Sequence, residues 1–183
     1  MFTVVPNMSH IITLHPLLQY SHHDVIGNPC SQLLWDLREH PTYMRFVKNN
    51  RKPTSYYLDQ PATTPAVTYL DITCGLFPIP WSIEAHNPRG VTIYDVLRAI
   101  YHVTQTAIIP CEWEMLSEKH QDRVAVVFED RWSSAYNRMQ VRSFGVTRAD
   151  CLLRSTSFAG LSMSYDKRCS AILTLSRNSR LEN

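Results

Sequence analysis

The clearest pattern along the chain is an alternation of apolar and polar residues with a period of two, which is typical of β-strands that bury one face. Segment 32–38 has this pattern: one face is apolar, and the other carries Asp36 and Arg38. His40-Pro41 ends the strand, because proline donates no backbone hydrogen bond. The alternation returns in later segments, which we predict as further strands: 66–74, 81–86, 146–153, 158–164 and 169–176.

A helical period replaces the alternation in the middle of the chain. Over 93–105 the apolar residues form one face of a helix, and Thr92 with Asp95 makes a capping box at its N-terminus. After Pro110, apolar residues again recur at helical spacing, which predicts a second helix over 111–131. Strands, two helices and further strands together predict an α+β fold, with a mostly antiparallel sheet and two principal helices packed on one face.

The remaining segments show neither period. Residues 47–65 contain several prolines, so we predict a long loop with a short extended piece at Tyr56-Tyr57-Leu58. Residues 1–30 are irregular as well, and the polar C-terminal end is expected to fray. A chain of 183 residues suits a single domain, so we expect one domain over 1–183 with an ordered core of about 12–176.

Composition favours a folded protein in a reducing compartment. Apolar residues make up 44% and charged residues 19% of the chain, which is a globular composition. The 5 cysteines form no CxxC motif, so we expect free thiols, with Cys111 at the start of the second helix as the most reactive. No segment has the features of a signal peptide or the roughly 20 apolar residues of a membrane span. We therefore expect a cytoplasmic protein, with the nucleus as the alternative, and no membrane partner.

Neither nucleic acid nor a metal ion is expected as a ligand. The chain carries 18 basic and 16 acidic residues, a net charge of +2, without the basic face that a phosphate backbone requires. His22-His23-Asp24 and Glu118-x-His120 lack the further ligands that a metal site needs, so we interpret them as a solvated loop and a helix interface. We predict no metal site and no cofactor.

The order of several motifs resembles one known family. LHPLL, LLWDLREHP, PATTPAVTYLDI, PWSIEAHN and GVTIYDVLRAIY follow one another along the chain, and Glu112-Trp113 precedes Arg123-Val124. The series is similar to an uncharacterised family of fungal domains, mainly from basidiomycetes, known as a domain of unknown function. The resemblance covers roughly residues 14–161, and its most specific parts are Trp35-Asp36-Leu37-Arg38 and the helix motif at 91–97. It implies a small intracellular domain without established catalytic residues.

Two pairs of polar residues are candidates for acid–base chemistry. Asp36 and Arg38 share a strand face, and so do Glu84 and His86 on the strand 81–86. A carboxylate beside a guanidinium or an imidazole can line a ligand site or take part in proton transfer. The same residues can also form a structural ion pair or an ordinary polar surface. Neither pair belongs to a complete catalytic motif.

Aromatic residues provide the remaining candidate site. Trp35, Trp81 and Trp113 fall on apolar faces and are expected in the core, whereas Tyr56 and Tyr57 lie in the proline-rich loop. Exposed aromatic side chains on a stiff loop are good anchors for a protein partner or a small apolar ligand.

On this basis we predict a non-catalytic intracellular binding or protein-interaction domain, and a homo-oligomer stays open. The alternative is a small cofactor-independent enzyme, such as an isomerase, a cyclase or a hydrolase. Its acid–base groups would come from the two polar pairs on the predicted strands.

Overall fold

The computed structural model describes residues 11–20 and 32–178. The strands are β1 (Thr13–Leu14), β2 (Leu33–Leu34), β3 (Arg45–Phe46), β4 (Thr63–Thr64), β5 (Tyr69–Thr73), β6 (Ile83–His86), β7 (Ser157–Met163) and β8 (Ser170–Ser176). The α-helices are α1 (Ser55–Leu58), α2 (Ile93–Gln105), α3 (Pro110–Glu114), α4 (Glu118–Ser134) and α5 (Arg138–Phe144). The 3₁₀ helices are η1 (Pro41–Tyr43) and η2 (Asp150–Leu152).

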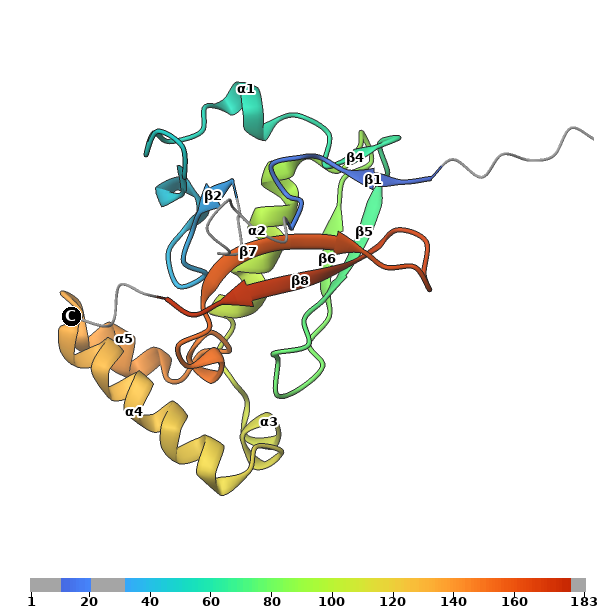
Figure 1. Cartoon of the computed structure of the whole chain (residues 1–183). Helices are drawn as coiled ribbons and strands as arrows, with labels where there is room; N and C mark the ends of the chain where they lie inside the picture. Colours follow the sequence, from blue (N-terminus) through green and yellow to red (C-terminus); the bar gives the residue numbers. More distant parts are fainter. Residues whose placement is uncertain (1–10, 21–31, 179–183) are drawn as a thin grey trace, which may run out of the picture.

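A sheet of strands in the order β6-β5-β8-β7 forms the centre of the molecule (Figure 1). β5 pairs antiparallel with β6, and β7 pairs antiparallel with β8, while β5 and β8 join the two pairs in parallel. Two shorter antiparallel pairs, β1 with β4 and β2 with β3, contact the sheet through β7. The α+β class and the mostly antiparallel sheet predicted from the sequence are therefore confirmed.

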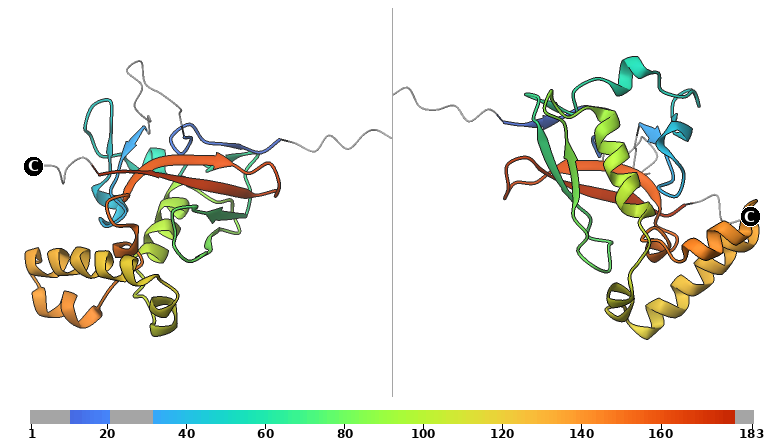
Figure 2. Two further views of the ribbon diagram at one scale, coloured as in Figure 1. Left: turned by 60° about the horizontal axis from the view of Figure 1, so that its bottom comes forward. Right: turned by 180° about the vertical axis from the view of Figure 1, so that it is seen from behind.

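α2 covers one face of the sheet, and it has the predicted bounds (Figure 2). Its N-terminus is closed by the predicted capping box: the Asp95 N–H donates to Thr92 Oγ1 at 3.2 Å, and the Thr92 N–H donates to Asp95 Oδ2 at 3.0 Å. The helical spacing gathers its apolar residues into one stripe, which packs on the sheet mainly at β6. The large buried side chains of this stripe are Ile93, Val96, Leu97 and Ile100.

The strands bury the faces that the alternation predicts. On β5 and β6 the buried side chains are Leu70, Ile72, Ile83 and Ala85. Segment 32–38 alternates in the same way, and it buries Leu33, Trp35 and Leu37. Only Leu33 and Leu34 of this segment form a continuous strand, which pairs with β3. Asp36 contacts β7 through an isolated bridge to Ser157. The predicted strands 158–164 and 169–176 correspond to β7 and β8.

The predicted helix 111–131 is instead two helices, α3 and α4. Ser117 has an extended backbone, with φ −64° and ψ 148°, and this conformation interrupts the helix. Gln121 in the first turn of α4 donates its side-chain N–H to the carbonyl of Trp113 at 2.8 Å, so it satisfies a group that the end of α3 exposes. The apolar spacing continues across the bend, which is why the sequence pattern predicts a single helix.

The predicted strand at 146–153 is wrong, because this segment turns through η2. The Asp150 carboxylate accepts hydrogen bonds from the Thr147 N–H at 2.8 Å and from the Thr147 hydroxyl at 3.0 Å, and these bonds close a tight turn. The extended piece predicted at Tyr56-Tyr57-Leu58 is wrong as well. It lies in α1, where the Tyr57 N–H donates to the carbonyl of Thr54 at 3.0 Å.

The second principal helix does not lie on the sheet, contrary to the expectation that both helices cover one face. α4 packs mainly against η2 and against α5, a helix that the sequence pattern does not predict. The two helices project beyond the sheet (Figures 1 and 2). Val124 is the buried residue of α4, and α5 buries none, so the apolar residues of this region are not buried against the sheet. None of the helices in the described part of the chain combines the length and the apolarity that crossing a membrane requires.

Candidate functional site

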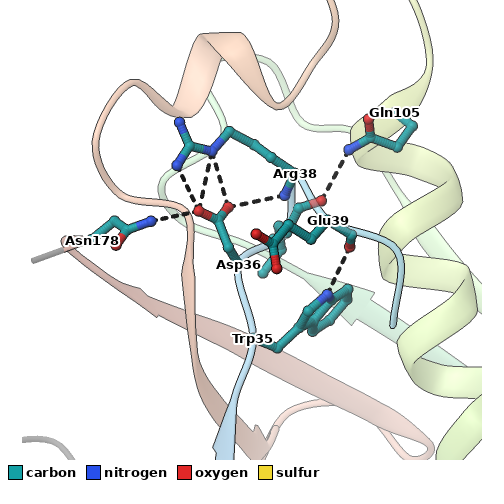
Figure 3. Close-up of polar contacts among 7 residues, drawn as sticks. Trp35, Asp36, Arg38, Glu39, Gln105 and Asn178 are labelled. Carbon is teal, nitrogen blue, oxygen red and sulfur yellow. Dashed lines mark hydrogen bonds and ion pairs between the residues drawn. The ribbon is translucent and has the colours of Figure 1, made fainter. Parts of the chain in front are cut away.

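Asp36 and Arg38 form an ion pair in the turn that follows β2 (Figure 3). Arg38 Nη2 donates to Asp36 Oδ2 at 2.6 Å, Nε donates to Oδ1 at 3.0 Å, and the backbone N–H of Arg38 donates to Oδ1 at 3.0 Å. Asn178, which follows β8, donates to Oδ2 of the same carboxylate. The Asp36 carboxylate thus connects its own turn to a segment that lies far away in the sequence.

The backbone of this turn is fixed by hydrogen bonds from several elements. Trp35 Nε1 donates to the carbonyl of Glu39 at 2.8 Å, and Gln105 at the end of α2 donates to the carbonyl of Leu37 at 2.9 Å. The Leu37 N–H donates to the carbonyl of Thr156 at 2.8 Å. These bonds join α2, the turn and the start of β7, so the turn connects three elements of the fold.

Both members of the ion pair keep their charge. Burial raises the pKa of Asp36, but the hydrogen bonds and the positive charge of Arg38 outweigh this effect, so the pKa of the carboxyl lies below its usual value. The hydrogen bond to Asp36 in turn raises the pKa of Arg38. An ionised carboxylate has no proton to give as a general acid, and its hydrogen bonds occupy the lone pairs that a general base needs.

Asp36 and Glu39 also line two cavities, of about 320 Å³ and about 480 Å³. The larger cavity lies between the turn and α4, and its wall contains Asp130, Arg131 and Arg154. Charges of both signs therefore face the same space, and they give it no preference for an anion or a cation.

Glu84 and His86 are exposed on β6, away from the Asp36 turn. Asp71 on β5 lies directly opposite Glu84 in the antiparallel pair. Both β6 side chains line a cavity of about 460 Å³, whose other wall is the α2 stripe Asp95, Arg98, Ala99 and His102. The two polar pairs predicted from the sequence as acid–base candidates therefore line different cavities and do not form one site.

Tyr57 lines an open apolar groove between α1 and β3, which we call the aromatic groove. Its volume is about 440 Å³, and its wall consists of Leu17, Gln32, Phe46, Val47, Lys48, Asn49 and Tyr57. The ring of Tyr57 packs edge-on against Phe46 and against Tyr56, with centroids 5.4 Å apart in both pairs. Tyr56 exposes 74% of its surface and Tyr57 exposes 41%, so this row of rings is open to solvent.

Lys48, in the wall of the aromatic groove, belongs to a basic segment of the chain. The segment 45–52 carries Arg45, Lys48, Arg51 and Lys52 and no acidic residue. Lys48 lines the groove, and Lys52 Nζ lies 5.2 Å from the centroid of the Tyr43 ring. Within residues 11–20 and 32–178, none of the four cations forms an ion pair. Their charge is available to a ligand.

Two further ion pairs, neither of them among the candidates predicted from the sequence, hold the helical region together. Asp150 is completely buried and accepts a hydrogen bond from Arg131 Nη2 at 2.8 Å. Glu112 accepts from Arg148 Nη2 at 2.8 Å and from Trp81 Nε1 at 2.7 Å. The first pair links α4 to η2, and the second links α3 to the segment before η2. The Trp81 hydrogen bond joins α3 to the segment before β6.

The sequence contains a signal for one of these pairs. Arg131 continues the apolar stripe of Val124 and Phe128 at helical spacing, and an arginine in such a stripe needs an acidic partner. Glu112 has no comparable signal, because a glutamate in the first turn of a helix is explained by the helix dipole alone.

No group of three or more His, Cys, Asp or Glu side chains in the described ranges is arranged to hold a metal ion. His22-His23-Asp24 lies outside the described residues. His120, interpreted from the sequence as a helix-interface residue, has its Nε2 at 3.0 Å from the carbonyl oxygen of Cys151. It therefore joins α4 to η2.

The described cysteines are free thiols: Cys74, Cys111, Cys151 and Cys169. Burial raises the pKa of Cys151 to about 12, with the nearby charge of Asp150 as the next cause. This thiol is neutral and inert. Cys111, the thiol expected to be most reactive, is exposed at the start of α3.

Fold and site together define a small α+β protein with an apolar groove whose wall contains Lys48. The chain belongs to a family described as "Family of unknown function (DUF6699)", whose profile matches residues 33–169. No curated protein and no solved structure matches the chain. The matched segment contains the Asp36–Arg38 pair, β6 and most of the aromatic groove, whereas Leu17 and Asn178 lie outside it.

Proposed function

We propose that this chain is a non-catalytic binding domain, in which the aromatic groove receives an apolar side chain of an acidic protein segment. The observation that carries the proposal is the row of rings formed by exposed Tyr56 and Tyr57 and half-buried Phe46, beside a cavity of about 440 Å³. Aromatic side chains contribute much of the energy of protein interfaces, because each ring buries a large apolar area at a low cost in conformational entropy.

Lys48 and the basic segment that contains it favour an acidic partner. Arg45, Lys48, Arg51 and Lys52 lie within one short segment, and no carboxylate neutralises them among the described residues. Acidic residues that flank the apolar side chain of a partner would meet Lys48 in the wall of the groove, within the field of this basic segment. Charges at this position raise the association rate and the selectivity more than the affinity itself.

A protein segment fits the groove better than a small apolar ligand. Pockets for small molecules bury most of the surface of the ligand. The aromatic groove instead has Tyr57 and Val47 in its wall with 41% and 47% of their surfaces exposed. It can receive one side chain of a longer segment, while the backbone of that segment remains at the surface.

The alternative of a small cofactor-independent enzyme has less support. Acid–base catalysis requires its groups within hydrogen-bond reach of one substrate. Asp36 and Arg38 line other cavities than Glu84 and His86 do, and the Asp36 carboxylate already accepts bonds from Arg38 and Asn178.

We also infer a reducing, cytoplasmic setting. Cys74 and Cys151 are buried as free thiols, and Cys111 is exposed without a partner cysteine. Unpaired thiols are typical of proteins inside the cell, where disulfides are rare. The resemblance of the sequence motifs supports a fungal origin.

Binding of a synthetic peptide tests the proposal. The probe is a fluorescein-labelled peptide with one central Trp flanked by Asp and Glu, and fluorescence polarisation measures its affinity. We expect Tyr57→Ala to weaken binding about tenfold, which corresponds to about 1.4 kcal/mol, because the variant removes one wall of the groove. Lys48→Glu should weaken binding most strongly at low ionic strength, where charges are least screened.

Two controls make the result specific to the groove. Tyr136 lies between α4 and α5 and is fully exposed, so Tyr136→Ala should bind the peptide as the wild type does. A peptide with Lys in place of the acidic residues should bind more weakly than the acidic peptide. Absence of binding up to about 1 mM, or unchanged binding by Tyr57→Ala, would show that the aromatic groove does not have this function.

A further inference from the structure

The outer edge of β6 is an open edge of the central sheet. β6 is the first strand in the order β6-β5-β8-β7 (Figure 1). The opposite edge, β7, is partly covered through bridges with Gln19 and Asp36. Among residues 11–20 and 32–178, no segment pairs with the outer side of β6. An open edge presents unpaired backbone donors and acceptors, which can pair with another strand.

The hydrogen bonds of β5 show which groups point outwards. The Asn87 N–H donates to the carbonyl of Thr68 at 3.0 Å, so this pair is a hydrogen-bonded one. Pairs alternate along an antiparallel ladder, so Tyr69–His86 and Asp71–Glu84 are non-hydrogen-bonded.

The Asp71 N–H confirms this alternation of pairs, because it points away from β6 and donates to the carbonyl of Cys169 on the β8 side at 2.9 Å. Both the N–H and the C=O groups of Glu84 and His86 therefore point away from β5. They are the groups that the open edge offers to another strand.

We propose that β6 pairs antiparallel with β6 of a second copy of this chain, with the twofold axis at Ala85. In this register, Glu84 of one copy lies opposite His86 of the other, and the symmetry creates the pair twice. The outward N–H and C=O groups of Glu84 then face those of His86 in the other copy, so each Glu84–His86 pair exchanges two backbone hydrogen bonds. The two sheets become one continuous sheet with both α2 helices on the same side. The proposal does not depend on the aromatic groove, which lies on β3 and α1.

Charge selects this register among those that the backbone allows. Only residues whose backbone N–H and C=O groups point outwards can form hydrogen-bonded pairs across the edge. The nearest alternative registers therefore place Glu84 opposite Glu84 or His86 opposite His86. Two carboxylates directly opposite each other destabilise a strand pair, and two imidazoles leave Glu84 without a donor opposite it, whereas a carboxylate opposite an imidazole can accept its hydrogen bond. Within one copy Glu84 already lies opposite Asp71, a like charge. An imidazole from the other copy would offset this repulsion.

A second copy fits this edge better than a foreign charged segment. The cavity beside the edge contains the carboxylates of Glu84 and Asp95, the guanidinium of Arg98 and the imidazoles of His86 and His102. This mixture favours neither an acidic nor a basic partner, whereas it is complementary to itself about a twofold axis. The α2 residues along the cavity add contact area beyond the four-residue strand.

Sedimentation velocity over a range of concentrations tests the proposal. We expect the wild type to be a concentration-dependent dimer. His86→Glu places Glu opposite Glu84 in both pairs and should weaken dimerisation about tenfold or more. The double variant Glu84→His with His86→Glu restores opposite partners in the same register, so it should dimerise as the wild type does. Both side chains are exposed, so these changes leave the core intact.

A cross-linking experiment tests the register itself. In a Cys111→Ser background, a mixture of the Glu84→Cys and His86→Cys variants should form a disulfide-linked dimer faster than either variant does alone. Glu114→His, at an exposed position on α3, serves as the control for sedimentation and should not change the dimer. A chain that remains monomeric up to about 1 mM would overturn the proposal, and so would a dimer unaffected by His86→Glu.

Discussion

α2 and α4 are the two longest helices in the described part of the chain, and they are held by different forces. α2 has 13 residues and buries four large apolar side chains against the sheet. α4 has 17 residues, yet it buries only Val124. Its attachment is polar: Arg131 donates to the buried carboxylate of Asp150, and His120 lies against the carbonyl of Cys151. Helix length therefore does not indicate how strongly a helix is held here.

The difference predicts two levels of stability within one chain. Apolar burial contributes roughly in proportion to area, so α2 belongs to the cooperative core. A helix held by a few polar contacts opens locally at a lower free energy than the core does. We expect α4 and α5 to exchange their amide protons faster than α2, as measured by hydrogen–deuterium exchange.

The largest effect is expected from a cavity beneath α2. Leu97 is completely buried, so Leu97→Ala should lower the free energy of unfolding by about 2–5 kcal/mol. Urea denaturation measures this loss. The matched control on the other helix is Val126→Ala, because Val126 is 61% exposed, and its effect should stay within about 0.5 kcal/mol. Similar losses from both variants would contradict the contrast between the two helices.

The second effect concerns the polar attachment of α4. Asp150→Ala leaves Arg131 without its partner and removes the bonds to Thr147, so we expect a loss of about 3 kcal/mol. The loss should appear as faster amide exchange in α4 and α5, while α2 keeps its protection. Asp150→Asn preserves the shape and one acceptor, and it should show a smaller change. An equal loss of protection in α2 would mean that α4 belongs to the same cooperative unit.

The sequence predicts the fold well where burial is periodic. α2 and the buried faces of β5 and β6 follow from residues such as Val96, Leu97, Leu70 and Ile83, because each element presents one apolar face to the core. α5 buries nothing, so it leaves no period to detect. Segment 146–153 is apolar enough for a strand, but the Asp150 side chain bonds to the Thr147 backbone and forms a turn instead.

The candidate sites show the same division between local and distant information. The period of two places Asp36 and Arg38 on one face, and the structure brings them together. Their third partner, Asn178, lies 142 residues from Asp36, a distance over which local periodicity carries no information. The exposed position of Tyr57 follows from its proline-rich surroundings, whereas the contact with Phe46 depends on how β3 and α1 meet.

The smallest loss in the free energy of unfolding is expected when the Asp36–Arg38 ion pair is removed, and it differs from that of the Asp150–Arg131 pair. The Arg38 side chain is 26% exposed and the Asp36 side chain 12%, so Asp36→Asn should cost about 2 kcal/mol at neutral pH. The folded pKa of Asp36 is depressed, so its contribution is complete above its unfolded pKa of about 4. It is lost as the pH falls through the folded value. The difference between wild type and variant, from urea denaturation, should therefore shrink in acid.

A control variant and a measurement of amide protection test whether the Asp36–Arg38 pair stabilises the core. Asp166 is exposed in the segment between β7 and β8, so Asp166→Asn should differ little from the wild type at any pH. The Asp36 turn is bonded to Gln105 of α2 and to the end of β8, so its loss should lower the amide protection of α2. Protection lost only from α4 and α5, or a difference that does not change with pH, would show that this ion pair does not stabilise the core. The pair would then act like the Arg131 attachment, as a local contact at the edge of the fold.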